Sequence, residues 1–522
     1  MRPYRRWRLI GAGLVIALLS AGCSSGAASD SAGTGRSGTL TIAFSSATQT
    51  QDPATSASPL YDFPAYDSLI YQAPDGGYEP DLATSWGYVG SGNTTFQLTL
   101  RKGVRFSDGS AMTPAAVAAS LNRYLAANKG SPITGPVSSV TVSGPDQVEL
   151  HYSSSVPYAF AAWSLTPAVG FGMIVGPHGL ADTKALSTYT DGVGPYVFDA
   201  AESVSGGNQV YLPDKYYFNQ AAIRYSKVVI EPITSNSSEL AAAQSGQVLV
   251  DVNLAAAQMS TARSAGMEIV TQPAGDADDL ILEKTTSGPL ANPEVRQAIE
   301  YAMPRSEILS AVFAGAGTAT SSNSQAGFAG YDPADVGLYP YDVAKAKQLM
   351  ASAGYASGFS LSVLTGLGTT PTFAEAIAVA LKAIGITASI TDNTGGFPQF
   401  AAAAETKNYT ALVLTTPAQS IYTTLKSAML PGQTENLWGA TDSALNADLT
   451  AAATGSTVAT QDTALQTVTS QLDHLAWIVP VSVTASYAAV AAGLHNVPST
   501  NRSQLIVADP FAPDASQAWY GS

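Results

Sequence analysis

The stretch TTFQLTLRKGVRFSDGSAMTPAAVAASLNR, from Thr94 to Arg123, decides the fold. Its first half alternates polar and apolar residues at period two, which is typical of strands with one buried face. The alternation predicts two paired strands, Thr94–Leu100 and Val104–Phe106, on either side of Lys102-Gly103. Short strands bounded by turn residues indicate a layered domain with a sheet at its centre.

Turn and capping signals follow these strands. SDGS, from Ser107 to Ser110, contains the residue types that turns favour. Thr113 followed by Pro114 predicts a helix start, since threonine caps free N–H groups and proline fits the first helical position. Units of this kind, helix then strand, alternate between Ser226 and Ile390, so the chain is expected to be an α/β protein.

A second helix start lies in NPEVRQAIEYAM, from Asn292 to Met303. Asn292 is the expected N-cap and Pro293 the first helical residue. Val295, Ile299 and Met303 recur at helical spacing and predict a buried face. YDVAKAKQLMASAG is a further amphipathic helix, which Gly354 is expected to end.

The N-terminus has the layout of a secretory signal. Four arginines precede an apolar run, Leu9 to Leu19, and small residues follow it. The run is shorter than the roughly 20 residues that span a bilayer. Residues 1–22 are therefore expected to be a signal peptide. Cys23, the sole cysteine, then becomes the first residue, and residues 23–37, rich in Ser, Gly and Ala, form a flexible tether.

Composition limits the possible partners. The chain has 522 residues, with 39 acidic against 24 basic side chains and a net charge of −15. This balance argues against nucleic acid or an anionic lipid surface as a partner. Hydrophobic residues make up 46 % of the chain, which is enough for folded cores, and its length implies two or three domains.

The motifs together resemble a known family, the peptide- and nickel-type extracytoplasmic solute-binding proteins (family 5) of bacterial ABC importers, and Cys23 resembles the acylated cysteine of a bacterial lipoprotein. The resemblance runs from about Leu40 to Val497. Besides the opening stretch, it rests on PDLATSW (80–86), DGVGPYVF (191–198), YLPDKYYF (211–218), ELAAAQSGQVLVDVN (239–253), PLANPEVRQAIEYAMPRSEIL (289–309), YDVAKAKQLMASAGY (341–355) and LKAIGITASI (381–390).

The resemblance implies a periplasmic-binding-protein-like α/β fold, with two lobes around a ligand cleft and an extra inserted domain. DGVGPYVF and WIVPVSV (477–483) look like returns of the chain to one shared sheet. The implied division is a discontinuous domain I (38–64, 193–276 and 480–522), an inserted domain II (65–192) and a domain III (277–479).

Binding without catalysis is the expected activity. The sequence contains no Gly-x-Ser-x-Gly elbow, Ser-x-x-Lys or His-Glu-x-x-His motif. The four histidines, His151, His178, His474 and His495, lie far apart and lack acidic or cysteine neighbours at metal-ligand spacing. The chain is therefore expected to be no enzyme and to need neither cofactor nor metal.

The resemblance also suggests where a ligand binds. The segments that match the family's cleft are SSATQTQ (45–51), TGLGTT (365–370), TTPAQSIY (415–422) and ENLWG (435–439). The ligand-binding candidates are the aromatic residues Tyr422 and Trp438 and the polar residues Thr48, Gln49, Gln419 and Asn436.

Two departures from dipeptide-binding relatives predict a nearly uncharged cleft. Those relatives place an Asp after the strand that matches NYTALVLTTP, and an Arg where this chain has residues 365–370; neither is present here. A buried zwitterion without ion partners is costly, so a longer peptide or a neutral compound such as an oligosaccharide fits better. The expected partners are this ligand and the membrane subunits of an importer, with the protein a monomer at the outer face of the cell membrane. Two alternatives stay open: a sensor lipoprotein that feeds a signalling partner, and an oligosaccharide-binding protein of the same fold.

Overall fold

A computed structural model describes residues 38–56, 61–73, 77–131, 133–366, 371–393, 397–417, 420–427, 429–495 and 519–520. These residues belong to one compact unit that begins at Arg36. The expected signal peptide, Cys23 and the tether lie outside the described residues. Every helix within them is too short or too polar to cross a bilayer.

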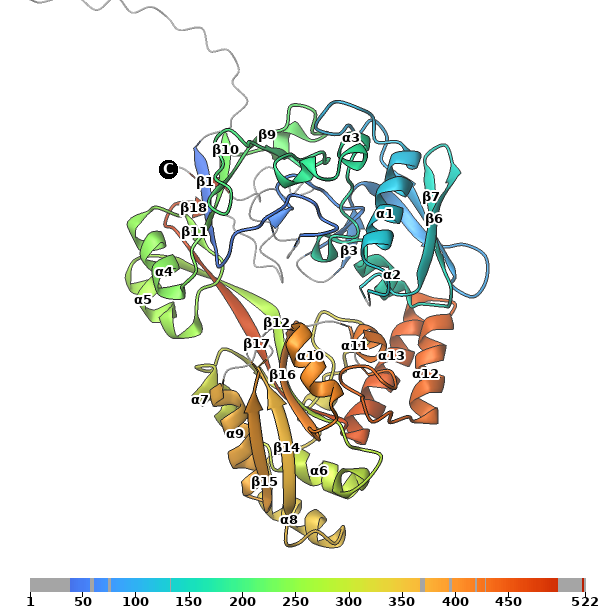
Figure 1. The fold of residues 1–522 in the computed structure, drawn as a ribbon, viewed down its shortest axis with the longest axis vertical. Helices are drawn as coiled ribbons and strands as arrows, with labels where there is room; N and C mark the ends of the chain where they lie inside the picture. The colour runs from blue at the N-terminus through green and yellow to red at the C-terminus, as the bar shows by residue number, and fades with distance from the viewer. Residues whose placement is uncertain are drawn as a thin grey trace, which may run out of the picture. The chain divides into compact units, whose positions relative to one another are not determined.

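One mixed sheet of eleven strands forms the centre of the described chain (Figure 1). Its order is β15-β14-β16-β12-β17-β11-β1-β10-β9-β8, with β13 paired to β17. The strands are β1 Thr39–Phe44, β8 Tyr196–Phe198, β9 Gln209–Pro213, β10 Lys227–Pro232, β11 Val250–Asp251, β12 Glu268–Leu282, β13 Gly317–Ala319, β14 Phe359–Thr365, β15 Ile386–Asp392, β16 Ala411–Pro417 and β17 Ile478–Val490.

The two long strands β12 and β17 join two halves of this sheet. The start of β12 pairs with the end of β17, which also pairs with β11. The end of β12 pairs with both β17 and β16. Between them the register shifts from Gln272↔Ser486 to Asp276↔Thr484, which places extra residues on β12. A bulge of this kind bends a strand. We call β1 and β8–β11 the N-terminal half, and β14–β16 the C-terminal half.

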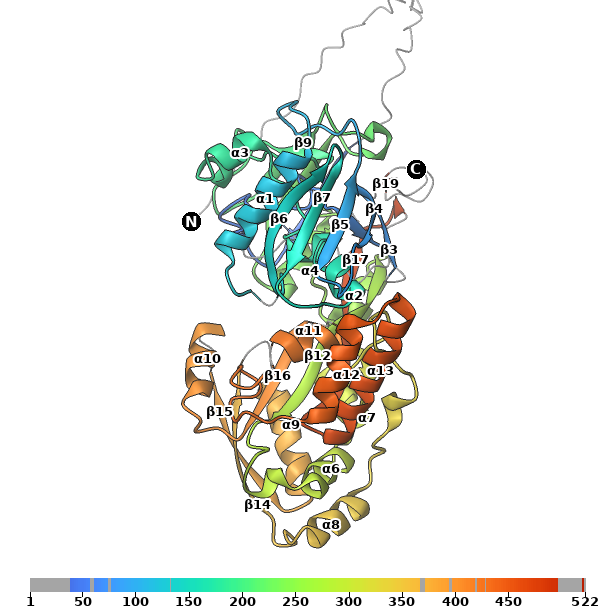
Figure 2. The ribbon, with the colours of Figure 1, turned by 90° about the vertical axis from the view of Figure 1, so that its right-hand side faces the viewer.

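A separate antiparallel sheet has the order β4-β5-β7-β6, and α1 packs against it (Figure 2). Its strands are β4 Ala83–Tyr88, β5 Thr95–Leu100, β6 Val137–Gly144 and β7 Gln147–Tyr152. Two-stranded pairs join β2 Ile70–Gln72 to β3 Tyr78–Pro80, and β18 Leu494–His495 to β19 Trp519–Tyr520.

The prediction of a strand over Val104–Phe106 is wrong. β5 pairs with β4 and β7 instead. The segment after it folds into a tight loop, in which Phe106 N donates to Ser110 O and Met112 N to Val104 O. Val104 and Phe106 are nevertheless buried, because the loop inserts them into the core. The apolar alternation therefore came from burial and not from strand pairing.

The capping predictions are confirmed. Thr113 accepts a hydrogen bond from Ala116 N at the start of α1, and Asn292 accepts one from Glu294 N at the start of α6. Asp342 caps α8, which ends just before Gly354 in the left-handed region (φ 84°). The helices are α1 Pro114–Ala127, α2 Tyr158–Trp163, α3 Pro177–Ala181, α4 Asn236–Ser245, α5 Met259–Ser264, α6 Pro293–Tyr301, α7 Arg305–Val312, α8 Val343–Ser352, α9 Pro371–Lys382, α10 Phe397–Glu405, α11 Ile421–Ser427, α12 Ser443–Thr454 and α13 Val458–Leu475.

The C-terminal half of the sheet is covered on both faces. Leu280 and Val413 share one core with residues of α6, α7, α8 and α9. Ile281 and Leu414 belong to a second core, with residues of α10–α13. Because successive side chains of a strand point to opposite faces, neighbouring residues of β12 enter different cores.

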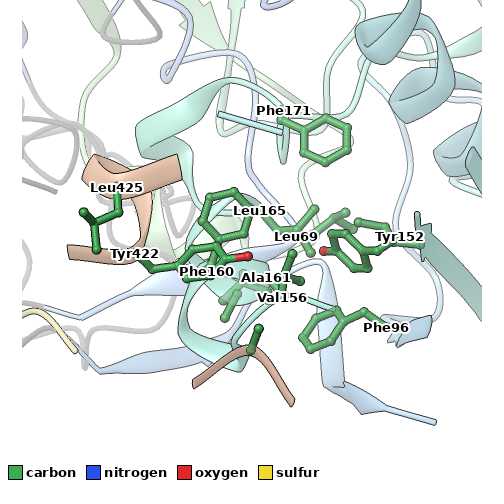
Figure 3. Packing of buried hydrophobic residues seen from close by; sticks show 14 of the residues in the cluster. Leu69, Phe96, Tyr152, Val156, Phe160, Ala161, Leu165, Phe171, Tyr422 and Leu425 are labelled. Carbon is green, nitrogen blue, oxygen red and sulfur yellow. The ribbon is translucent and has the colours of Figure 1, made fainter. Parts of the chain in front are cut away.

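The second core also contains α2 and the four-stranded sheet (Figure 3). Tyr422 of α11 packs on Phe160 of α2, with ring centroids 5.4 Å apart. Two hydrogen bonds lie nearby: the Asn93 side chain donates to Ala453 O, and Tyr158 N donates to Gln461 Oε1. The α11–α13 side of the sheet is thus packed against the segment that carries α2.

Candidate functional site

Strand β12 carries an unusual run of acids, Asp276, Asp278 and Asp279, within the sequence GDADDLILE. Its register with β16 is Asp276↔Pro417, Asp278↔Thr415 and Asp279↔Leu414. Carboxylates rarely occupy the interior of a sheet unless they are paired, because removing them from water is costly. The partners of these three acids therefore decide what the strand does.

Asp278 has hydrogen-bond partners on both neighbouring strands. Thr415 Oγ1 donates to Asp278 Oδ1 at 2.9 Å, and Ser482 Oγ donates to Asp278 Oδ2 at 2.8 Å. Burial still raises the pKa of Asp278 to about 6. This acid is held by β16 and β17 and acts as part of the sheet.

Asp279 faces the other way, into a cavity on the α11 side of the sheet. Glu435, in the loop before α12, lines the same cavity. Its volume is about 30 Å³, room for an occupant about the size of a water molecule. The other lining residues are Ala277, Ile281, Thr320, Ser322, Asn323, Gln325, Leu414, Thr416, Thr424, Ile478, Pro480, Ser482 and Val483. We call this space the acid cavity.

The two carboxylates of the acid cavity lack partners. Among the described residues, no side chain or backbone group donates a hydrogen bond to Asp279 or Glu435, and no cation pairs with either. Burial raises the pKa of Asp279 well above its ordinary value, and the charges of Asp278 and Glu435 raise it further. Burial raises the pKa of Glu435 to about 7.

A third unpartnered acceptor lines the acid cavity. Gln325 is 9 % exposed, and its Oε1 has no hydrogen-bond partner in the described part of the chain. Buried polar atoms of native proteins are almost always hydrogen-bonded, so each exception calls for an explanation. The acid cavity thus contains two carboxylates and an amide oxygen that accept no hydrogen bond from the described residues.

Strand β17, which contributes residues to the acid cavity, also lines a larger cavity of about 450 Å³. Val483 lines the acid cavity, whereas Thr484 and Tyr487 line the larger one. Its other walls are Val252 to Ala257, which follow β11, and Val312, Phe313, Ala314 and Ala316 at the end of α7 and before β13. Small-molecule sites usually measure about 300–1,000 Å³, so this cavity has the size of one.

The structure does not bring the predicted site residues into one cluster. Thr48 is buried in the loop after β1, where its hydroxyl donates to Thr50 O at 2.9 Å. Gln49 beside it is exposed. Gln51, two residues on, is the buried glutamine, and it accepts a hydrogen bond from Tyr211 Oη at 2.7 Å. Gln419 lies outside the described residues.

Tyr422 and Asn436 are occupied by the protein itself. Tyr422 is 3 % exposed, packs on Phe160 and donates its hydroxyl to Ser155 O at 3.4 Å. The Asn436 amide donates to Met429 O and Ala440 O and accepts from Ala440 N. Tyr422 thus packs α11 on α2, and Asn436 holds the loop that contains Glu435. The roles of both side chains toward a ligand remain predictions.

Trp438 does not line the acid cavity, and its ring lies beside two lysines. The ring centroid is 4.9 Å from Lys284 Nζ and 5.7 Å from Lys407 Nζ. Lys284 follows β12 and Lys407 precedes β16, so the ring sits where β12 ends and β16 begins. Trp438 lines neither of the two cavities described above. Its expected contact with a ligand also remains a prediction.

The expectation of a nearly uncharged ligand cleft stays a prediction. It rests on Thr415, Thr416 and Pro417 at the end of β16 and on residues 365–370, and these residues are neutral. The neighbouring strand β12 supplies the acids instead, because it pairs with β16 along its last seven residues. A signal was present in the sequence: Asp276, Asp278 and Asp279 precede the apolar run LIL of a strand.

The described histidines have separate surroundings. His151 Nε2 is hydrogen-bonded to Thr141 Oγ1, and His474 Nδ1 to Ser470 O. The ring of His178 packs on Tyr189. Within the described ranges, no three His, Cys, Asp or Glu side chains are grouped so that they could hold a metal ion.

Comparison with known proteins gives the family. Residues 77–422 match the model of "Bacterial extracellular solute-binding proteins, family 5 Middle". The chain is 27 % identical over 285 residues to the glutathione-binding protein GsiB of Salmonella typhimurium and 25 % identical over 283 residues to GsiB of Escherichia coli K12. Each match covers 53 % of both chains, so the chain spans about half the length of these curated relatives.

Solved structures share the fold over nearly the whole chain. The binding protein AgaA of A. tumefaciens R10, in complex with agropinic acid, matches with a TM-score of 0.72 and 22 % identity, covering 93 % of this chain and 99 % of AgaA. The murein tripeptide-binding protein MppA, in its unliganded open form, matches with a TM-score of 0.75 and 18 % identity, covering 92 % and 97 %. NikA of Brucella suis, in complex with Fe(III)-EDTA, gives 0.74 and 18 %, covering 90 % and 98 %.

These likenesses show a two-lobed, periplasmic-binding-protein-like α/β fold, as the sequence motifs led us to expect. The matched family consists of solute-binding proteins and not of enzymes. The chain belongs to family 5 of the bacterial extracellular solute-binding proteins.

Proposed function

We propose that this protein captures a small solute, a peptide or related compound, and delivers it to the membrane subunits of an ATP-driven importer. The observation that carries the proposal is the family match over residues 77–422. Relatives of the same fold bind glutathione, a peptide and agropinic acid, as their names state.

The pairing of β12 with β17 supports this role. In the described part of the sheet, the two long strands β12 and β17 connect the N-terminal half to the C-terminal half, and β12 is bulged between the two halves. Closure of two domains about a few strand residues is a common way to enclose a ligand. The cavity of about 450 Å³ is lined by Thr484 to Tyr487 of β17, so it lies beside this connection.

We also propose the three-part division, with domain I formed by 38–64, 193–276 and 480–522, domain II by 65–192 and domain III by 277–479. The separate four-stranded sheet, all within 83–152, supports an inserted domain II. The return of the chain to the main sheet at β8 supports the boundary near residue 193.

A thermal-shift screen of the full-length protein against peptides, amines and sugars tests the capture of a solute. A ligand that binds only the native state raises the melting temperature with its concentration. We expect at least one class to do so in a saturable way. A protein that no member of the three classes stabilises would contradict the capture of such a solute.

We further propose that acylated Cys23 anchors the protein at the outer face of the cell membrane. The sole cysteine, directly after the signal segment, supports this proposal. Cys23→Ser should move the protein from the membrane fraction to the soluble fraction, because no second lipid attachment point remains. A variant that stays with the membrane through high-salt washing would contradict the anchor. Ser24→Ala is the control and should leave the distribution unchanged.

A further inference from the structure

The acid cavity is a feature that the family assignment leaves unexplained. Its three unpartnered acceptors, Asp279, Glu435 and Gln325, come from β12, the loop before α12 and the segment after β13. None of them is needed to hold these segments together, since the described chain gives none of the three side-chain groups a hydrogen-bond partner. Hydroxyl groups such as those of Thr416 and Thr424 also line the cavity, but the described chain shows none of them donating to the three acceptors. An occupant that supplies donors would complete these acceptors.

The negative charge of the cavity favours an occupant of positive charge. Two carboxylates face one small space, and the only charges that act appreciably on Asp279 are negative, those of Asp278, Glu435 and Glu300. Described cations have other contacts: Lys284 and Lys407 lie against Trp438, Lys426 lies against Tyr422, and Arg305 pairs with Glu300. A cationic occupant would offset the cost of burying these acids.

The number of acceptors and the volume of the acid cavity limit which chemical groups can occupy it. A primary ammonium group has three N–H donors and no acceptor, which matches three acceptor groups. A volume of about 30 Å³ admits an –NH₃⁺ group and is too small for a planar guanidinium with its five N–H donors. A metal ion is a poorer match, because no group of three ionisable metal ligands exists among the described residues.

We propose that the acid cavity binds a primary ammonium group, the amino end of the captured solute, through Asp279, Glu435 and Gln325. This inference rests on the proposed function and deepens it: the solute is an amine and not a neutral compound. Hydrogen bonds to charged groups contribute about 1.5–3 kcal/mol each, so loss of one carboxylate should weaken amine binding by roughly 10- to 100-fold.

Methylammonium is the first probe, since it presents the head group alone. In the full-length protein at pH 8, methylammonium chloride should raise the melting temperature in a saturable way, and tetramethylammonium, which lacks N–H donors, should not. The isosteric variants Asp279→Asn and Glu435→Gln should lose the effect. Asp276→Asn removes a charge from the opposite face of the same strand and should keep it. An equal rise with tetramethylammonium, or in Glu435→Gln, would overturn the proposal.

Butylammonium distinguishes the end of a solute from a free ion. If the cavity receives the amino end of a larger molecule, butylammonium should bind at least as tightly as methylammonium, because its chain gains apolar contacts. If butylammonium fails while methylammonium binds, the occupant is a free ammonium ion and the link to the captured solute is wrong.

These experiments can refute the amine site without refuting the importer role, and the reverse. A solute from the screen that binds wild type and Glu435→Gln equally well would leave the importer role standing and refute the amine site. A saturable effect of the two amines, with no solute found, would support the site and count against capture of a peptide.

Discussion

Two groups of acids, one fully buried and one half-buried, differ in whether a cation completes them. Glu300 of α6 is fully buried and forms an ion pair with Arg305 of α7. The remaining donors of Arg305 go to Pro480 O, Glu300 O and Tyr339 O. Asp279 and Glu435, by contrast, face the acid cavity without a donor from the described residues.

The comparison separates charges that stabilise the fold from charges that are available to bind a ligand. The first pair has its charge balanced within the chain, and its donors tie α7 to β17, so the pair stabilises the fold. The second pair leaves negative charge to be balanced from outside. A fold tolerates such a site only if the cost of burial is small beside its total stability, or if an occupant offsets it.

The largest effect should come from breaking the balanced pair. Arg305→Met leaves Glu300 buried without its cation and removes the hydrogen bonds to three backbone carbonyls. Loss of one partner from a buried ion pair typically costs about 3–5 kcal/mol, and we expect that much loss of unfolding free energy in urea. Arg263→Met, at an exposed position, should change it by less than about 0.5 kcal/mol. Equal losses of unfolding free energy for the two substitutions would mean that the ion pair does not stabilise the fold.

A smaller change in unfolding free energy, of opposite sign, is expected for a substitution in the acid cavity. Burial raises the pKa of Glu435 to about 7, so its native state holds a proton that the unfolded chain releases near pH 4.5. The protein therefore loses stability as the pH rises from about 4.5 through 7. Glu435→Gln removes this loss and should stabilise the free protein by about 1–3 kcal/mol at pH 8, with little change at pH 4.

Denaturation at both pH values measures this difference. Glu307→Gln, an exposed acid of α7, is the control and should show no such pH dependence. A Glu435→Gln variant that is less stable than wild type at pH 8 would indicate that Glu435 has a cationic partner within the chain, and the comparison would fail.

The smallest effect is expected at Trp438. Its ring packs beside Lys284 and Lys407 and lines neither cavity. Trp438→Ala should therefore change the affinity for methylammonium by less than about twofold, well below the effect of Glu435→Gln. A loss of tenfold or more would return Trp438 to the ligand-binding set that the sequence predicts.

Local signals predicted the elements well, because they depend on neighbours in the sequence. Thr113 and Asn292 cap helices where their side chains reach N–H groups two or three residues ahead. The loop with Val104 and Phe106 was misread, since a period-two apolar pattern looks the same in a strand and in a loop that inserts side chains into a core.

The acid cavity could not be predicted in this way, because it depends on distant contacts. Asp279, Glu435 and Gln325 are separated by more than forty residues in each case and meet only when β12 pairs with β16 and β17. The stretch Thr415–Pro417 is neutral by itself, and the acids beside it lie on β12, more than a hundred residues earlier in the chain.

The pH dependence of methylammonium binding tests the central claim most directly. Burial raises the pKa of Glu435, and the charge of Glu435 in turn raises the pKa of Asp279 and of Glu283, which Lys407 lowers. With a pKa of about 7, Glu435 is mostly ionised at pH 8 and mostly protonated at pH 5. Methylammonium should therefore raise the melting temperature of the full-length protein at pH 8 and have almost no effect at pH 5. An equal rise at both pH values, or a larger one at pH 5, would contradict recognition of a cation by the unpartnered acids.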